Sequence, residues 1–110
     1  KSRNEKHIAV SVEHATSFSQ RLLGLMGKPT MPYQHALWIS NCPSIHTFFM
    51  RFPIDVIFVD KNLRVKAVYH SIQPWRVSRY VLGADSVFEL KGGTLDETSV
   101  QVGDQLHVCT

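Results

Sequence analysis

The chain alternates apolar and polar residues in several short runs, a pattern typical of β-strands whose two faces differ. In residues 7–14, HIAVSVEH, the apolar Ile8, Val10 and Val12 recur with a period of two. Further runs rich in β-branched and aromatic residues are ALWIS (36–40), IHTFFM (45–50), IDVIFVD (54–60), RVKAVYHSI (64–72) and SVFEL (86–90). These runs predict a mainly β protein.

One segment changes to the period of a helix. Ser17 and Gln20 have the spacing of a capping box, and Gly27 ends the run. The apolar residues that would share one helical face are Phe18, Leu22, Leu25 and Met26. Thr94 and Glu97 repeat the capping-box spacing after Gly92 and Gly93. The pattern predicts one short amphipathic helix and a second helical turn.

Turn residues divide the strands. Residues 60–63, DKNL, predict a hairpin, because Asp and Asn side chains bond nearby backbone groups. Pro53 predicts a bend or an edge position between two runs. Residues 102–108, VGDQLHV, predict a turn at Asp104 followed by a strand with Leu106 and Val108 on one face.

The fold class follows from these elements. Short strands with little helix predict a compact antiparallel β-barrel or sandwich, at the border between all-β and α+β, with the helix covering one opening or edge. A chain of 110 residues with 44% apolar residues suffices for one core. We expect a flexible start over residues 1–6 and a single domain over residues 7–110.

Charge and hydropathy exclude some classes of partner. The formal charge is +3, and the twelve Lys and Arg residues are spread along the chain, so no nucleic-acid footprint is expected. No apolar run approaches the roughly 20 residues that span a bilayer, which predicts a soluble chain without membrane insertion. The chain begins with Lys1 rather than Met, so a removed leader, a cytoplasmic location and an extracytoplasmic location all stay open.

The two cysteines, Cys42 and Cys109, are too few for a disulfide scaffold. A bond between them and a pair of reduced, partly buried thiols both remain open, and the thiols are favoured. Cys42 and His46, with Asp55 or His70 as a third ligand, lack a recognised zinc spacing. We therefore expect no metal and no cofactor.

Several segments together resemble the domain of unknown function 192 family. They are RLLGLMGK (21–28), CPSIHTFFMRFPIDVIFVDKNLRV (42–65), QPWR (73–76), GADSVFELKGG (83–93) and VGDQL (102–106). These segments cover nearly the whole chain in the family's order, and the long central motif is the specific one. The resemblance implies a compact, mostly β domain with a short helix, and it implies no activity and no catalytic residues.

The central motif contains three polar candidates for a binding site. An unperturbed imidazole titrates near pH 7, which makes His46 a candidate proton carrier or ligand, although a histidine bonded to backbone at a strand end is the more common case. Arg51 and Asp55 are predicted to form an ion pair that pins the bend at Pro53. An unpaired Arg51 would instead suit a carboxylate, phosphate or sugar ligand.

Two tryptophans offer surfaces for stacking. Trp38 lies between Leu37 and Ile39 in a predicted strand, so a core position is expected. Trp75 and Arg76 lie in residues 73–83, QPWRVSRYVLG, which read as a strand end passing into a surface loop. They are the better candidates for the wall of a binding site.

The leading functional hypothesis is a noncatalytic binding module for a small polar ligand or a protein segment, with a site near His46, Arg51, Trp75 and Arg76. A small hydrolase-like enzyme that uses His46 with Asp55 or Cys42 is the alternative. A third hypothesis is an accessory protein of a cell-envelope assembly, because exposed sheet edges can accept another strand.

Overall fold

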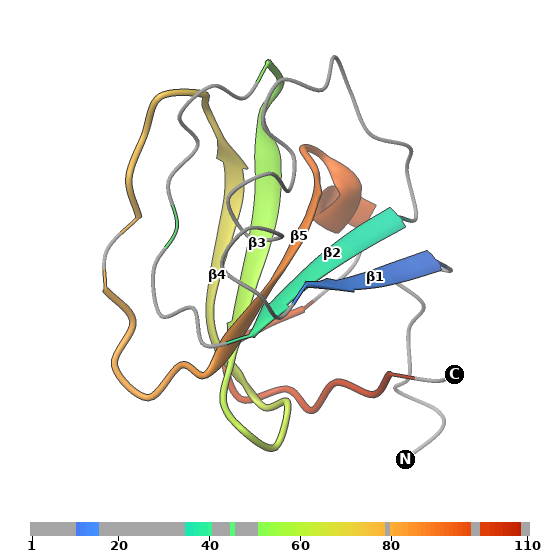
Figure 1. Ribbon diagram of the computed structural model, residues 1–110, viewed down its shortest axis with the longest axis vertical. Helices are drawn as coiled ribbons and strands as arrows, with labels where there is room; N and C mark the ends of the chain where they lie inside the picture. The colour runs from blue at the N-terminus through green and yellow to red at the C-terminus, as the bar shows by residue number, and fades with distance from the viewer. Residues whose placement is uncertain are drawn as a thin grey trace.

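The computed structural model describes residues 11–15, 35–40, 45, 51–78, 80–97 and 100–108. Its elements are β1 (Ser11–Ala15), β2 (His35–Ser40), β3 (Ile54–Val59), β4 (Val65–Ile72), β5 (Ser86–Lys91) and the 3₁₀ helix η2 (Thr94–Glu97), as Figure 1 shows. The mainly β class is confirmed, and so is the predicted helical turn at residues 94–97. The helix predicted from Ser17 and most of the run at 45–50 lie outside the described residues.

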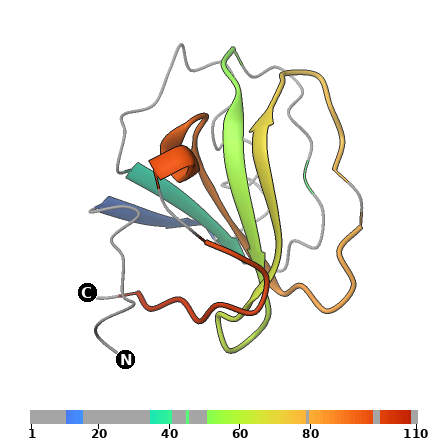
Figure 2. The same ribbon diagram turned by 180° about the vertical axis from the view of Figure 1, so that it is seen from behind.

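The strands form one five-stranded sheet in the order β1-β2-β5-β3-β4. β1 runs parallel to β2, and the other neighbours are antiparallel. β1 and β4 are the two edges, so the described strands form an open, twisted sheet rather than a closed barrel (Figures 1 and 2). β5 lies at the centre, between two strands that precede it in the sequence.

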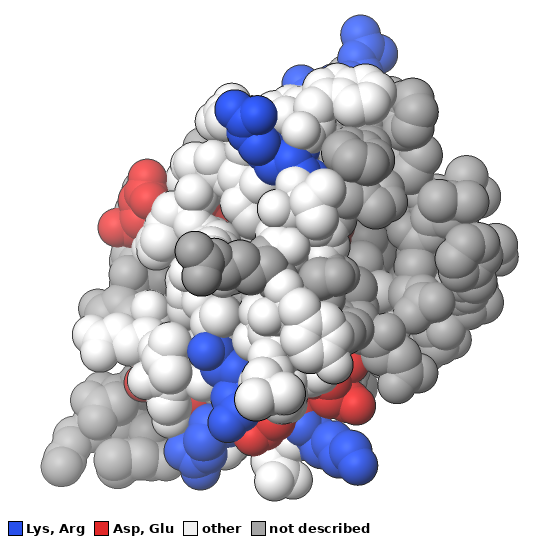
Figure 3. All heavy atoms as spheres, turned by 90° about the vertical axis from the view of Figure 1, so that its left-hand side faces the viewer, with Lys and Arg blue, Asp and Glu red and all other residues white. Residues whose placement is uncertain are grey.

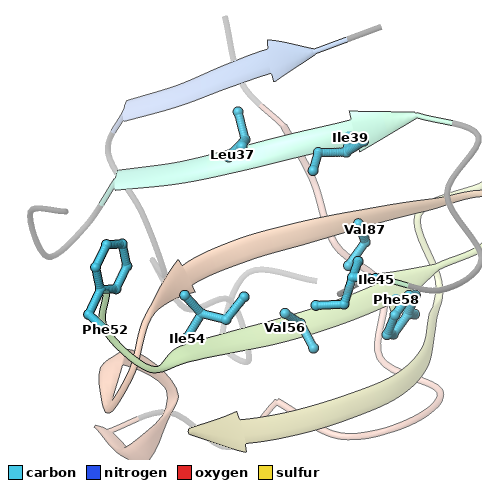
Figure 4. Packing of buried hydrophobic residues seen from close by; sticks show 8 residues of the cluster. All are labelled: Leu37, Ile39, Ile45, Phe52, Ile54, Val56, Phe58 and Val87. Carbon is cyan, nitrogen blue, oxygen red and sulfur yellow. The ribbon is translucent and has the colours of Figure 1, made fainter. Parts of the chain in front are cut away.

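Both faces of the central strands β3 and β5 are buried, because residues from outside the strands pack on each face: Ile45 and Phe52 on one, and Leu95 on the other. The first core contains Leu37, Ile39, Ile45, Phe52, Ile54, Val56, Phe58 and Val87 (Figure 4). The second core, on the other face, contains Ala36, Ile57, Val59, Val65, Phe88, Leu90 and Leu95. All six residues of β3 are buried, which explains why its sequence is continuously apolar apart from Asp55. As expected, Trp38 packs against the second core, where its ring stacks on Phe88 at 5.3 Å.

The β3–β4 hairpin is confirmed, and a side chain closes its turn as the sequence predicts. One oxygen of Asp60, Oδ1, accepts hydrogen bonds from the Asn62 amide at 2.8 Å and the Arg64 amide at 3.0 Å. The bond from Arg64 is the main reason that the pKa of Asp60 lies below its usual range. The hairpin therefore rests on local chemistry that is visible in the sequence.

The C-terminal segment lies beside this hairpin (Figure 2). The Val65 amide donates to the Asp104 carbonyl at 2.8 Å, and the Leu106 amide donates to the Leu63 carbonyl at 2.9 Å. The strand predicted after Asp104 is reduced to one isolated bridge between Arg64 and Gln105. Leu106 and Val108 nevertheless both pack against the second core, as their predicted common face requires.

Candidate functional site

Asp55 is fully buried, and backbone amides hold both of its carboxylate oxygens. Oδ1 accepts from the Ser71 amide at 2.7 Å, and Oδ2 accepts from the Gly93 amide at 3.1 Å and the Leu95 amide at 2.8 Å. The carboxylate thus joins β3 to the end of β4 and to the turn that leads into η2. Hydrogen bonds to a charged acceptor compensate the burial of that charge.

The backbone around Asp55 is shaped to deliver these amides. β4 bulges opposite Asp55, because Ile54 pairs with Ile72 while Val56 pairs with Tyr69, and the extra residue allows Ser71 to turn its amide toward the carboxylate. The amide of Gly92 donates to the Pro53 carbonyl at 3.0 Å. A Cβ at Gly92 would lie 3.0 Å from that carbonyl oxygen, so a side chain there would press on the Pro53 backbone and glycine favours the close approach of the two segments.

The predicted ion pair between Arg51 and Asp55 is wrong. Arg51 is exposed, whereas Asp55 lies on the face of the sheet that carries the second core. There the three backbone amides already donate hydrogen bonds to its carboxylate. Proximity in sequence suggested the pair, but residues on either side of a strand entry need not face one another. The bend at Pro53 is held instead by the hydrogen bond from Gly92.

Two exposed side chains approach the Asp55 carboxylate. His70 Nδ1 lies 3.6 Å from Asp96 Oδ1. One ligand atom from each of Asp55, His70 and Asp96 lies within 4.8 Å of the others. The bulge on β4 and the short helix η2 therefore bring an imidazole and two carboxylates from three separate elements to one place.

Glu89 is the second buried carboxyl group, and the sequence analysis did not select it. It lies in the middle of β5, opposite Leu37 of β2 and Val56 of β3, and shares the first core with them. Only 6% of the residue is exposed. Burial raises the pKa of the Glu89 carboxyl to about 7, so this group changes its charge near neutral pH.

The loop between β4 and β5 exposes large apolar side chains. The exposed fractions are 57% for Trp75, 66% for Val77, 69% for Tyr80 and 85% for Leu82. The exposed Arg76 lies among them. Figure 3 looks onto the side of the molecule along which this loop runs in Figure 1: among the described residues, uncharged surface takes up much of the middle of that face, Lys and Arg side chains lie toward its top and bottom, and Asp and Glu side chains lie at its lower end and left margin. We call residues 75–78 and 80–82 the loop surface.

The loop is attached to the first core. The Ser78 amide donates to the Ile45 carbonyl at 2.8 Å, and the Ile45 amide donates to Ser78 Oγ at 2.9 Å. Val81 and Ala84 pack against the first core. The backbone of Trp75 has a φ of 67°, a left-handed conformation that a non-glycine residue adopts at a cost. Core contacts and hydrogen bonds therefore position a loop on which Trp75, Val77, Tyr80 and Leu82 are exposed.

The structure separates the candidate residues that the sequence grouped together. Asp55 is buried beside η2, whereas Trp75 and Arg76 are exposed on the loop surface and Arg51 is exposed at the entry to β3. His46 and Cys42 lie outside the described residues. Neither the approach of Asp96 to His70 nor the burial of Glu89 was predicted from the sequence. Both depend on the tertiary structure, that is, on the β4 bulge and on the arrangement of the strands.

The open mixed sheet with two buried faces defines a mainly β protein without an evident catalytic constellation in the part of the chain described. The chain belongs to the family DUF192, described as an uncharacterized ACR, whose model matches residues 1–108. None of the helices in the described part of the chain has the length and apolar character needed to cross a bilayer.

Relatives and solved structures support the same assignment. The chain is 36% identical over 105 residues to the UPF0127 protein PF1050 of Pyrococcus furiosus, covering 93% of this chain and 90% of the relative. It is 37% identical over 100 residues to the UPF0127 protein PH1112 of Pyrococcus horikoshii, covering 86% of this chain and 84% of the relative. Neither name states an activity.

Two crystal structures share the fold. A Sinorhizobium meliloti 1021 protein (R01717), named a "putative transcription regulator", has a TM-score of 0.74 at 25% identity and covers 86% of this chain and 78% of its own. A protein of unknown function from Novosphingobium aromaticivorans has a TM-score of 0.76 at 20% identity, covering 86% of this chain and 71% of its own. The family and its neighbours thus define the fold without an agreed function.

Proposed function

We propose that this protein is a noncatalytic binding module that receives a segment of another protein on the loop surface. The observation that carries the proposal is the concentration of exposed apolar side chains there: Trp75, Val77, Tyr80 and Leu82 are all more than half exposed on eight consecutive positions. Exposed apolar residues that gather in one place mark interaction sites more often than isolated ones do.

The attachment of the loop favours binding. Because Ile45 and Ser78 exchange two hydrogen bonds and Val81 packs against the first core, the loop backbone is already ordered by contacts with the sheet. A preorganised surface loses less conformational entropy when a partner binds. Tyrosine and tryptophan are the residues that most often anchor such contacts.

A protein segment fits this surface better than a small polar ligand does. Small-ligand sites are concave and converge on a few polar groups, whereas the loop surface exposes four large apolar or aromatic side chains. The exposed Arg76 and the formal charge of +3 favour a segment that combines acidic and apolar residues.

The enzyme alternative receives less support, because Asp55 already has a structural role and its proposed partners His46 and Cys42 lie outside the described residues. Its oxygens accept three backbone hydrogen bonds that maintain the fold. His46 and Cys42 lie outside the described residues and add no geometry in favour of catalysis.

The proposal is tested by selecting short random peptides from a displayed library on the wild-type protein, with counter-selection on a Tyr80→Ser, Leu82→Ser double variant. The enriched peptides are expected to carry acidic and apolar residues and to bind the double variant at least about tenfold more weakly, because loss of anchor side chains typically costs more than 1 kcal/mol. Synthetic peptides and fluorescence anisotropy provide the measurement.

Val102→Ser is the matched control. Val102 is also a large apolar residue, 66% exposed, but it lies in the C-terminal segment, outside the loop surface. Its peptide affinities should equal those of the wild type. Failure to enrich peptides, or equal binding to the wild type and the double variant, would overturn the proposal.

A further inference from the structure

The group formed by Asp55, His70 and Asp96 lies on other elements than the loop surface and has a different chemistry. We propose that these three side chains bind one divalent transition-metal ion. Their ligand atoms lie within 4.8 Å of one another, and His70 Nδ1 and Asp96 Oδ1 are already 3.6 Å apart. This site was not expected from the sequence, which indicated no metal.

The separations require only a small adjustment. Ligands at about 2.1 Å from a common ion lie at most about 4.2 Å from each other. His70 and Asp96 are exposed side chains, 52% and 67% accessible, so rotation about their side-chain bonds can bring their ligand atoms closer. Asp55 does not need to move, because only the side chains of His70 and Asp96 have to rotate toward its carboxylate.

The hydrogen bonds of Asp55 leave one acceptor position available. A carboxylate has about four lone-pair positions. Oδ2 accepts two amide bonds and Oδ1 accepts one, so one position remains on Oδ1. The same amides fix the orientation of the carboxylate, as outer hydrogen bonds commonly do for metal ligands.

Charge also favours a cation at this place. Among the residues that the structure describes, no Lys or Arg forms an ion pair with Asp55 or Asp96, and the one ionic contact there is with His70. Two carboxylates that approach each other without a cation repel. A divalent ion bound between them would offset both charges while the neutral imidazole supplies a nitrogen ligand.

The ligand set indicates the class of metal. Mg²⁺ and Ca²⁺ take oxygen ligands, whereas one imidazole with two carboxylates suits ions such as Mn²⁺, Fe²⁺, Co²⁺ and Zn²⁺. The three ligands come from β3, from the bulged end of β4 and from η2. A bound ion would therefore tie η2 to the edge of the sheet.

Paramagnetic Mn²⁺ locates the site in the folded protein. In amide-resolved nuclear magnetic resonance spectra, substoichiometric Mn²⁺ should broaden the signals of Ser71, Gly93 and Leu95 first, because their amides bond the Asp55 carboxylate. The signal of Gly103, in the turn beside the β3–β4 hairpin, should persist. Broadening centred on other residues would overturn the assignment.

Calorimetric titration with Zn²⁺ tests the ligands individually. His70→Gln and Asp96→Asn should each weaken binding at least about tenfold. Both replace exposed side chains, and unchanged amide spectra away from η2 would verify that each variant folds. His107→Gln removes another exposed histidine as a matched control and should bind as the wild type does. Wild-type affinity in the His70 and Asp96 variants, or no binding by the wild type, would refute the site.

Discussion

Replacing Glu89 by Gln should remove a pH-dependent loss of stability. The pKa of Glu89 is about 7 in the folded protein, against a usual value of 4.5. Between these values the folded protein keeps the proton that the unfolded chain releases, so the unfolded state binds fewer protons. The free energy of unfolding of the wild type must therefore fall as pH rises from about 4.5 through about 7.

The magnitude follows from the difference between the two pKa values. A shift from 4.5 to about 7 corresponds to about 3 kcal/mol, at about 1.4 kcal/mol for each pKa unit. This stabilisation is present below the unfolded pKa and is lost above the folded pKa. The difference in the free energy of unfolding between Glu89→Gln and the wild type should therefore shift by about 3 kcal/mol in favour of the variant from acidic to mildly alkaline pH. Any cost of the amide that does not depend on pH cancels in this comparison.

Urea unfolding over a series of pH values measures this difference. Glu89→Met should show the same flattened profile as Glu89→Gln, because neither side chain ionises. Val87→Ala is the matched control: Val87 lies two residues earlier on the same face of β5 and is fully buried. It should lose about 2 kcal/mol at every pH and retain the slope of the wild type.

A constant difference between Glu89→Gln and the wild type across the pH series would refute this reasoning. It would show that burial in the first core does not change the ionisation of Glu89.

Two further predictions concern the backbone around Asp55, both measured by urea unfolding. Asp55→Asn should lower the free energy of unfolding by about 3 kcal/mol, because it weakens the hydrogen bonds from three amides. Arg51→Met should change it by less than about 0.5 kcal/mol. Equal losses in the two variants would support the ion pair that the sequence suggested. Gly92→Ala should destabilise strongly, since its Cβ would lie 3.0 Å from the Pro53 carbonyl oxygen, whereas Gly103→Ala should cost only the roughly 1 kcal/mol of a left-handed alanine, because nothing lies within 4 Å. Equal costs at the two glycines would contradict the close approach at Pro53.

The elements that depend on neighbouring residues were predictable. Asp60 and Asn62 determine the β3–β4 turn within a few positions, so the hairpin was correctly placed. The apolar run of β3 and the helical turn at Thr94 were equally local. Pattern reasoning succeeds here because the stabilising contacts involve residues close in sequence.

Features that depend on strand order were not predictable. Val87 and Glu89 alternate with Phe88 and Leu90, a pattern that equally fits a strand with one solvent face. Both faces of β5 are buried only because a core packs on each side of the sheet, and the first core, which contains Leu37 and Val56, encloses Glu89.

The surroundings of Asp55 were unpredictable for a related reason. Its partners Gly93 and Leu95 are 38 and 40 residues away in the sequence, whereas Arg51 is only four away. A polar side chain in an apolar strand signals that a partner must exist, but the sequence does not identify it.

The central position of β5 also determines when the protein can become a complete sheet during synthesis. Until residues 86–91 have been added, β1 can pair with β2 and β3 with β4, but no strand joins the two pairs. The inner edges of β2 and β3 then offer unpaired backbone groups to other chains. A nascent chain that stalls before Ser86 would therefore be exposed to aggregation and to chaperone binding, and completion of β5 would close both vulnerable edges in one step.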